Sequence, residues 1–483
     1  MIVGQKEKGI FINGEWRDSY SGTVRAIINP ATLEKLTEIS YGGKEEALEA
    51  VEEAKAAFPS WSKKTARERS TFLYKAYEKM LENKEQLAQI LTSEQGKPLT
   101  EARTEIESAA SYLLWYAEEA NRVYGEIIPS SKVNRRSLVI PQAIGVIAAI
   151  TPWNFPASMV TRKLGPSLAA GCTVVLKPAS QTPLTAMAIV KIFEEVGLPK
   201  GVLNLVSGDA KGVGEALTQS PDVRLITFTG STEVGRELMK NSAQHIKKLS
   251  LELGGHAPIL VMDDADLENA VDLTLASKFR NCGQTCICAN RVYVHKEIAD
   301  SFIEKLAVKV KSMKIGNGID EATVIGPMID RNAVEKAAEH VEDAVHQGAT
   351  IITGGKEWQG NLGGHFYEPT ILVDVNDQMK VMNEETFGPV LPIETFDSIE
   401  EVIEKANQLP YGLAAYIMTE STNRVFQLSE ALEYGIIGVN DVFPATAEAP
   451  FGGIKESGFG KEGGKEGIME FVEMKYVSIG MTN

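Results

Sequence analysis

Three of the four cysteines in this 483-residue chain lie in one short stretch, as Cys282, Cys286 and Cys288. A cysteine acts as a nucleophile only as its thiolate, which needs a neighbouring charge, a helix dipole or a dry, shaped pocket. Gly283 allows a tight backbone turn before Cys286 and could present that sulfur at the rim of a cleft. Free cysteine is also among the most buried residue types, so this stretch alone fits a structural role equally well.

Two other polar residues stand in surroundings that favour chemistry. Glu252 lies in the apolar, glycine-flanked segment 251–255, and burial raises a carboxyl pKa toward the value that a general base needs near neutral pH. Asn154 lies in the rigid turn 152–156, where its amide could donate to a developing oxyanion. A satisfied structural carboxylate and an amide that only holds its turn are the alternatives. The six histidines show no metal-ligand spacing, so no metal site is predicted.

Two further segments carry groups suited to a dinucleotide. Gly230 and Ser231 follow a predicted strand and open a helix, whose N-terminal N–H groups can bind phosphate. The pattern is not G-x-G-x-x-G, so this signal is weak by itself. Lys177 ends another predicted strand, where its amine could bond ribose hydroxyls, and the neutral Ser180 could donate to a phosphate oxygen. An acidic residue at the ribose contact would instead favour NAD and repel a 2′-phosphate.

Regular alternation of strands and helices places these residues. Strands are predicted at 143–150, 173–176, 203–206, 224–228 and 249–251, and helices between them at 157–170, 183–196, 211–219 and 231–243. Such alternation is typical of a doubly wound α/β fold with a parallel sheet, which binds ligands beyond the carboxyl ends of its strands. Asn154, Lys177, Gly230 and Glu252 all fall at such ends. A second alternating set runs from 259 to about 439, and its first helix, 267–280, leads into the cysteine stretch.

The remaining segments frame these two sets. A hairpin is predicted at 11–16, and helical periodicity at 65–82, 84–95 and 100–121. Residues 122–141 form an excursion of short β-like pieces, and the tail 468–479 is predicted as a strand that could pair with another chain.

Composition and charge limit the function classes. The chain is 43% hydrophobic and 24% charged, as expected for a folded soluble protein. A net charge of -16 argues against nucleic acid or an anionic membrane as the main partner. The N-terminus lacks a signal-peptide pattern, and no apolar run is long enough to span a bilayer. The few, clustered cysteines do not form a disulfide framework, which indicates a reducing cytoplasm.

Seven ordered segments together resemble the aldehyde dehydrogenase superfamily over nearly the whole chain. They are 152–156, 177–180, 228–235, 251–255, 279–286, 385–389 and 450–453. The resemblance implies a Rossmann-like coenzyme domain, an α/β catalytic domain, a small β oligomerisation arm and a segment that returns to the cleft between substrate and coenzyme. The corresponding residues are 1–121 with 142–252, 253–440, 122–141 with 468–483, and 441–467. A homodimer or homotetramer is implied as well.

The same resemblance implies a role for each site residue. Cys286 would attack the aldehyde carbonyl, and the Asn154 side chain with the Cys286 N–H would hold the oxyanion. After a hydride passes to the nicotinamide, Glu252 would activate the water that hydrolyses the thioester. Glu385 would bond the nicotinamide ribose, with Phe387 beside the ring. The coenzyme-binding residues are completed by Trp153, Lys177, Ser180, Gly230, Ser231 and Leu253. Lys177 with Ser180 resembles the NADP-accepting members, so NADP is expected and NAD is the alternative.

Within the superfamily, the chain is most similar to the succinate-semialdehyde dehydrogenase branch. The segments 161–163 and 279–281 and the spacing of Cys286 and Cys288 carry this similarity. Arg162 and Arg280 would then clamp the distal carboxylate of the substrate with their bidentate forks. The loop 441–448 lacks the serine that is usual in that branch.

Several alternatives remain open. The two arginines could pair internally, and the enzyme could be a broad aliphatic or betaine-type aldehyde dehydrogenase. A non-catalytic scaffold protein and a thiol acyl-hydrolase that works without coenzyme are the alternatives of other classes.

A redox hypothesis concerns Cys286 and Cys288. On an extended segment both side chains would point to one face, roughly 6.6 Å apart along the chain, near the upper limit for a disulfide. A strained, reversible bridge would then switch the enzyme off under oxidation. Activity that is insensitive to peroxide, or is lost but not restored by dithiothreitol, would count against this hypothesis.

Overall fold

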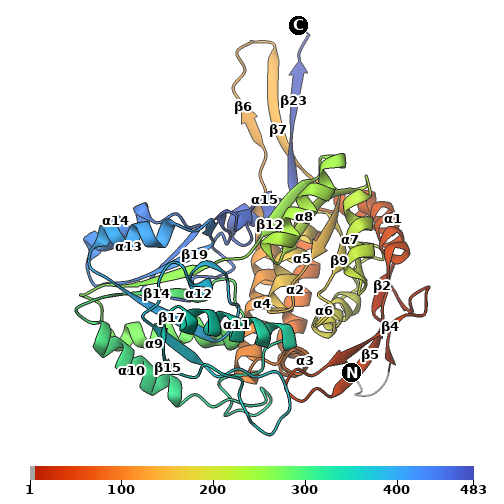
Figure 1. Ribbon diagram of the computed structural model, residues 1–483. Helices are drawn as coiled ribbons and strands as arrows, with labels where there is room; N and C mark the ends of the chain where they lie inside the picture. Colours follow the sequence, from red (N-terminus) through yellow and green to blue (C-terminus); the bar gives the residue numbers. More distant parts are fainter. Residues whose placement is uncertain (1–5, 483) are drawn as a thin grey trace.

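The computed structural model describes residues 6–482 and contains two large, mainly parallel sheets (Figure 1). The first sheet has eight strands in the order β22-β12-β11-β8-β9-β10-β2-β3. Its parallel centre consists of β8 (Val146–Ile150), β9 (Thr173–Lys177), β10 (Leu203–Val206), β11 (Val223–Thr229) and β12 (Lys248–Glu252). Antiparallel edges are added by the predicted hairpin, β2 (Ile10–Ile12) with β3 (Glu15–Arg17), and by β22 (Gly458–Phe459).

Helices cover both faces of this sheet, because alternate strand residues are apolar on each face. Buried side chains of one face pack against α1 (Lys44–Ser62), α7 (Ala210–Gln219) and α8 (Thr232–Ser242). The other face packs against α2 (Ala66–Glu82), α3 (Lys84–Gln95), α4 (Leu99–Glu119), α5 (Ser158–Ala170) and α6 (Pro183–Glu195). The predicted doubly wound arrangement is confirmed, and the predicted helix limits agree with the observed limits to within two residues.

The second sheet has seven strands around a separate hydrophobic core. Its order is β15 (Thr350–Thr353), β16 (Thr370–Val373), β17 (Val390–Phe396), β14 (Ala289–His295), β13 (Ala257–Val261), β19 (Ala414–Met418) and β20 (Ile436–Val439). The helices of this half are α9 (Leu267–Phe279), α10 (Ala299–Lys311), α11 (Arg331–His346), α12 (Lys380–Asn383), α13 (Ile399–Asn407) and α14 (Thr422–Ala431). Helix α9 leads directly into the cysteine stretch.

A three-stranded arm projects from the body at the top of Figure 1. It consists of β6 (Glu126–Ile128), β7 (Arg135–Ala143) and β23 (Val472–Gly480). The tail therefore pairs within its own chain, with β7, through nine residue pairs. The single strand predicted for 143–150 was wrong: β7 ends at Ala143, and Gly145 with φ +137° separates it from β8.

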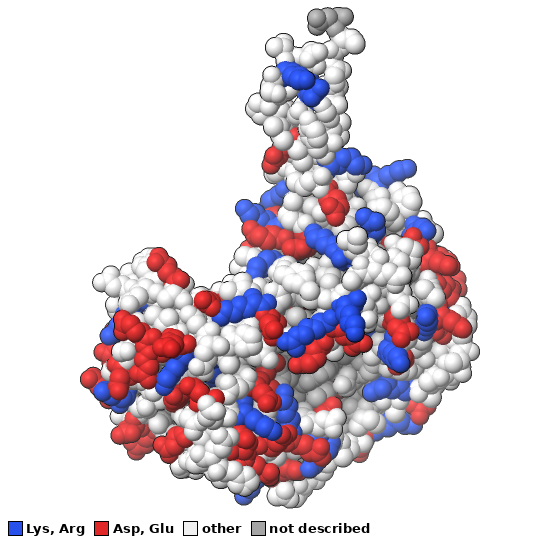
Figure 2. Space-filling model, turned by 45° about the horizontal axis from the view of Figure 1, so that its top comes forward, with Lys and Arg blue, Asp and Glu red and all other residues white. Residues whose placement is uncertain are grey.

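Short elements complete the chain. They are β1 (Lys6–Glu7), β4 (Val24–Ile28), β5 (Lys35–Ser40), β18 (Tyr411–Gly412), β21 (Ile454–Lys455) and α15 (Gly464–Met469). Acidic and basic side chains are interspersed over the body, whereas the projecting arm carries few of them (Figure 2). Within residues 6–482, every helix is too short or too polar to cross a membrane.

Candidate active site

One cavity of about 640 Å³ brings several predicted site residues together. Cys286, Arg162 and Arg280 all line it. Aromatic rings form part of the remaining wall, and the acidic side chains come from the first turns of α4 and from α9. Among these additional lining residues are Phe155, Phe443, Phe451, Glu101, Glu105 and Asp272. The cavity thus combines a thiol, two guanidinium groups and an apolar surface.

The cysteine loop is held in a tight conformation before Cys286. Asn281, Cys282 and Gly283 all have positive φ angles, of 50°, 56° and 74°. Only glycine fits at position 283, because a Cβ there would lie 2.2 Å from the carbonyl oxygen of Gly388. The segment after it is not extended, since the Cys288 N–H donates to the Thr285 carbonyl at 3.1 Å and closes a turn. The extended geometry expected for Cys286 and Cys288 was therefore wrong.

The four cysteines are free, and only Cys286 keeps partial exposure. Cys288 donates to the Gly283 carbonyl at 3.3 Å and accepts from the buried Lys278 amine at 3.8 Å. Burial, reinforced by the charge of Glu385, raises the pKa of the Cys286 thiol to about 12, while Arg162 opposes the shift. Cys286 therefore rests as a neutral thiol. The regulatory bridge with Cys288 stays a prediction.

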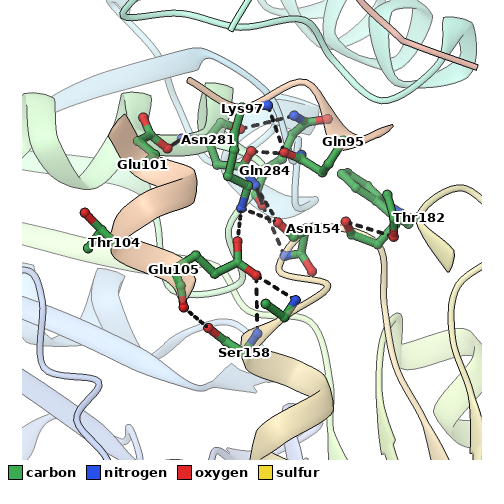
Figure 3. A network of polar contacts seen from close by, with 12 residues as sticks. Gln95, Lys97, Glu101, Thr104, Glu105, Asn154, Ser158, Thr182, Asn281 and Gln284 are labelled. Carbon is green, nitrogen blue, oxygen red and sulfur yellow. Dashed lines mark hydrogen bonds and ion pairs between the residues drawn. The ribbon is translucent and has the colours of Figure 1, made fainter. Parts of the chain in front are cut away.

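The Asn154 amide faces the cysteine loop. Asn154 is buried at the carboxyl end of the first sheet, and its Nδ2 donates to the Gln284 carbonyl at 3.1 Å. Its own main-chain carbonyl accepts from Lys97 Nζ and Asn281 Nδ2, at 2.7 and 3.0 Å (Figure 3). The turn that carries Asn154 (residues 152–156) and the cysteine loop (residues 281–288) are therefore joined by direct hydrogen bonds.

Glu252, the last residue of β12, is 3% exposed. Neither of its carboxyl oxygens has a hydrogen-bond partner among residues 6–482. Burial, followed by the nearby charge of Glu462, holds its pKa well above the usual range, although Lys163 opposes this. Gly452 makes room for the carboxyl group, because a Cβ there would lie 2.7 Å from Oε1. Glu252 is thus a protonated, desolvated carboxyl of the kind that can serve as a base when it ionises.

Both arginines are stacked on aromatic rings. The Arg162 guanidinium is buried 4.7 Å from the Tyr112 ring centre and 4.5 Å from that of Phe451. Its Nη1 forms an ion pair with a Glu462 carboxyl oxygen at 3.7 Å, so the alternative of internal pairing holds for this arginine, and both Nε and Nη1 are buried without a hydrogen-bond partner within the described chain. Arg280 lies in the same way between two rings, Phe155 and Phe443. Stacking leaves the Arg280 guanidinium edge available to an anion, whereas the Nε and Nη1 edge of Arg162 is closed off by burial.

The residues predicted for the adenosine side lie at the end of β9. Burial lowers the pKa of Lys177 to about 8, and its amine donates to the Pro178 carbonyl at 3.3 Å. Ser180 is 2.8 Å from the Tyr41 hydroxyl, and the Arg25 guanidinium is 5.5 Å from the Tyr41 ring centre. Arg25 and Tyr41 were not predicted, because they come from a distant part of the sequence.

The predicted phosphate site has the geometry of a helix start. Ser231 is the N-cap of α8, and its hydroxyl accepts from the Val234 N–H at 3.4 Å. The N–H of Gly230, directly before it, donates to the Glu252 carbonyl at 3.0 Å. Leu253 packs against Gly235, where a Cβ would lie 2.5 Å from its side chain. The first-turn N–H groups of such a helix are suited to a phosphate.

Glu385, Phe387 and Trp153 connect this region with the thiol. A Glu385 oxygen accepts from the Gly255 N–H at 3.4 Å, and a Cβ on Gly255 would lie 2.6 Å from the Cys286 carbonyl. Burial raises the pKa of Glu385 to about 7. The rings of Phe387 and Trp153 meet edge to face at 5.5 Å. The buried amine, the helix start and this carboxylate fit the ribose and phosphate groups of a nicotinamide dinucleotide.

Comparison with known proteins decides the family. The model of the aldehyde dehydrogenase family matches residues 16–477. The chain belongs to the aldehyde dehydrogenase family. It is 52% identical to an NADP(+) succinate-semialdehyde dehydrogenase of Escherichia coli K12 and 52% identical to a glutarate-semialdehyde dehydrogenase of Pseudomonas putida KT2440, with 97% of each chain covered. A crystal structure of an E. coli NADP-dependent enzyme superposes with a TM-score of 0.97 at 51% identity, covering 98% of both chains.

For several residues of this aldehyde dehydrogenase site, no role was predicted from the sequence. Lys97, Glu105 and Asn281 surround Asn154, and Lys163 with Glu462 lies beside Glu252 and Arg162. The charged ones are buried, which a sequence does not reveal. Two signals were available. Lys163 and Asn281 lie in the segments 161–163 and 279–281 that carry the family resemblance, and the spacing of Glu101 and Glu105 places two carboxylates on one face of a predicted helix.

The exposure and pKa of Cys286 give a direct prediction. Iodoacetamide should modify Cys286 before the three buried thiols. Since the thiol pKa is about 12, the modification rate should rise about tenfold per pH unit across the neutral and mildly alkaline range, without a plateau. Peptide mass spectrometry against a pH series measures both effects. C286A, which should lose the fast phase, is the control, and a plateau below pH ~8 would contradict the stated pKa.

Proposed function

We propose that this aldehyde dehydrogenase oxidises succinate semialdehyde to the dicarboxylic acid, with NADP as the preferred coenzyme. The observation that supports it most is the shared cavity: a nucleophilic thiol and two stacked guanidinium groups face one space of about 640 Å³. A semialdehyde carries a reactive carbonyl at one end and a carboxylate at the other, which matches this pair of features. The named activities of the most similar relatives point to the same substrate class.

The chain's own residues account for each step. Cys286 loses its proton and attacks the aldehyde carbonyl, and the Asn154 amide with the Cys286 N–H stabilises the oxyanion. The nicotinamide coenzyme, when bound, supplies a hydride acceptor. Glu252 then takes a proton from the water that hydrolyses the acyl-cysteine thioester. The desolvated position of Glu252 suits this role, because a raised pKa makes the ionised carboxylate a stronger base near neutral pH.

The coenzyme would lie along the carboxyl ends of the first sheet. Lys177 and Ser180 would hold the adenosine ribose and its 2′-phosphate, with Arg25 as an additional cation nearby. Gly230 and Ser231 would receive the pyrophosphate at the start of α8, beside Leu253. Glu385 would bond the nicotinamide ribose, with Phe387 and Trp153 beside the ring. The positive charge near Ser180 favours NADP over NAD.

The alternative functions do not account for the thiol, the two guanidinium groups, the buried carboxyl group and the coenzyme-binding groups together. A broad aliphatic or betaine-type aldehyde dehydrogenase has no need of two guanidinium groups in its substrate cavity. A scaffold protein would not need a desolvated carboxyl near a solvent-accessible thiol. A coenzyme-free acyl-hydrolase would not use the groups at Lys177 and Glu385. We place the enzyme in the cytoplasm, because its few, clustered cysteines are all free.

The substrate proposal is tested with a panel of aldehydes, with and without a distal carboxylate, assayed by formation of reduced coenzyme with NADP and with NAD. R280M should raise KM for succinate semialdehyde about 30-fold, because a charge-assisted bond worth about 2 kcal/mol is lost. Its effect on butanal should be several-fold smaller. R280K, which keeps the charge and loses the fork, is the matched control. Equal losses on both aldehydes, or a preference of the wild type for butanal, would contradict the proposal.

A second prediction concerns Glu252. E252Q should still form one equivalent of reduced coenzyme per active site in a burst, and then turn over about 10²–10³-fold more slowly, because the thioester persists. Since burial raises the Glu252 pKa, its ionised fraction and the deacylation rate should still be growing with pH above the range in which an ordinary glutamate is fully ionised. Stopped-flow absorbance resolves the burst from the steady state. A variant that loses the burst itself would argue against a role confined to hydrolysis.

The arm is proposed to join two copies of the chain. Its strands expose apolar side chains, among them Ile127 at 79% and Tyr476 at 59%. Ile127 pairs with Leu138 of β7 and Tyr476 pairs with Val139, so the two side chains lie on opposite faces of the arm. Apolar side chains exposed on both faces of a projecting arm favour a protein interface. The double variant I127D/Y476D should therefore sediment as a smaller species than the wild-type dimer or tetramer, and the wild type should not sediment as a monomer. An exposed Lys→Asp change on the body, K211D, should leave the sedimentation coefficient unchanged.

A further inference from the structure

A buried network of polar residues at the start of α4 forms hydrogen bonds with the turn that carries Asn154 (Figure 3). Lys97, just before α4, is 1% exposed, and its Nζ donates to Glu105 Oε2 at 2.6 Å and to the Asn154 main-chain carbonyl at 2.7 Å. The same amine lies 3.8 Å from the centre of the Phe155 ring. The ammonium group of Lys97 thus contacts the Glu105 carboxylate, the Asn154 carbonyl and the Phe155 ring.

Glu105 holds the other end of the same turn. Its Oε1 accepts from the N–H groups of Ala157 and Ser158, at 2.9 and 3.3 Å. These are the first N–H groups of α5, a helix without a side-chain cap of its own. The carboxylate therefore replaces the missing cap and complements the positive end of the helix dipole. Asn154 is consequently fixed from both sides, through its carbonyl and through the helix that follows.

The same segment also holds the cysteine loop. Glu101 Oε2 accepts from the Asn281 N–H at 2.8 Å, and Gln95 Nε2 donates to the Asn281 Oδ1 at 2.9 Å. The Asn281 amide in turn donates to the Asn154 and Gln284 carbonyls, at 3.0 and 3.1 Å. We call Gln95, Lys97, Glu101 and Glu105 the α4 clamp. It contacts both the cysteine loop, at Asn281, and the turn that carries Asn154.

We infer that the α4 clamp, and the Lys97–Glu105 pair above all, positions the Asn154 amide relative to the Cys286 sulfur. The inference rests on the proposed oxyanion role of Asn154 and names the residues that make that role effective. A buried ion pair contributes little net stability, because desolvation of two charges offsets their attraction. Its value here lies in geometry, since an oxyanion donor must sit within a few tenths of an ångström of the oxygen that it stabilises. Lys97 and Glu105 are thus positioning residues for acylation.

The test is a double-mutant cycle on the rate of the coenzyme-reduction burst, which follows acylation. K97M and E105Q should each slow the burst about 10–100-fold in the wild-type background. In the N154A background the same changes should cost less than about threefold, because the group that they position has gone. The dissociation constant for NADP should stay within about threefold of the wild-type value, and K97R should recover part of the rate.

Glu94 offers a matched control. It is a buried carboxyl group, its pKa raised to about 8 by burial, that accepts from the Leu184 and Thr185 N–H groups at the start of α6, at 2.7 and 2.8 Å. Its hydrogen bonds thus hold α6 rather than the turn that carries Asn154. E94Q should leave the burst rate unchanged. Equal losses from E94Q and E105Q, or losses from K97M and E105Q that are as large in N154A as in the wild type, would overturn the positioning role. An N154A burst as fast as that of the wild type would instead refute the oxyanion role of Asn154.

The isosteric E105Q keeps the test decisive if K97M does not fold. It retains the shape of Glu105 and an acceptor for the α5 N–H groups, and it removes the negative charge that faces Lys97 and the positive end of α5. A burst rate in E105Q equal to that of the wild type would count against the inference. Losses that are as large in N154A as in the wild type would count against it equally.

Discussion

Desolvation is the interaction on which this site depends. The carboxyl ends of strands in the first sheet meet the amino ends of β13 and β14 of the second sheet around Cys286, and the groups placed there lose most of their water. Burial raises the pKa of Cys286 to about 12 and that of Glu385 to about 7, and it lowers that of Lys177 to about 8. Glu252 is shifted upward for the same reason. Burial therefore shifts the Cys286 thiol and the Glu252 carboxyl group toward their neutral forms, whereas Lys177 stays mostly charged at neutral pH.

Two kinds of feature were predictable from the sequence. Strand and helix periods determine the doubly wound sheet, and Asn154, Lys177, Ser231 and Glu252 fall at strand ends because parallel strands present their carboxyl ends at one edge. The ordered motifs then identified the family. The turn at Cys286 was not predictable, because a spacing of two residues fits an extended strand as well as a turn. That choice is made by Gly388, whose carbonyl packs against Gly283 and fixes the loop from another part of the chain.

The α4 clamp shows why the rest escaped prediction. Lys97 contacts Asn154 across 57 positions, and Asn281 contacts Asn154 across 127. The sequence does not distinguish a buried lysine from an exposed one, because the role of a buried lysine depends on the partners that the fold places beside it. Positional periodicity reports which face of a helix is buried, but it does not report a polar residue that is buried with a partner. Such residues are therefore the part of a site that needs coordinates.

Arg162 shows how burial and specificity are connected. Its guanidinium lies between the Tyr112 and Phe451 rings, with Nε and Nη1 unpaired and Glu462 just beyond hydrogen-bond reach. Unpaired buried donors are unfavourable by about 1–3 kcal/mol each. Glu462 relieves only part of this, because its Oε2 stands 3.7 Å from Nη1, an ion pair without a hydrogen bond, while its Oε1 is bound to Lys163 at 2.6 Å. Both donors are too deeply buried for a ligand in the cavity to reach, so they remain without a hydrogen bond whether or not a carboxylate binds. The selectivity proposed for this cavity therefore depends on the positive charge that Arg162 brings to its wall and on Arg280, rather than on filling the empty donor positions of Arg162.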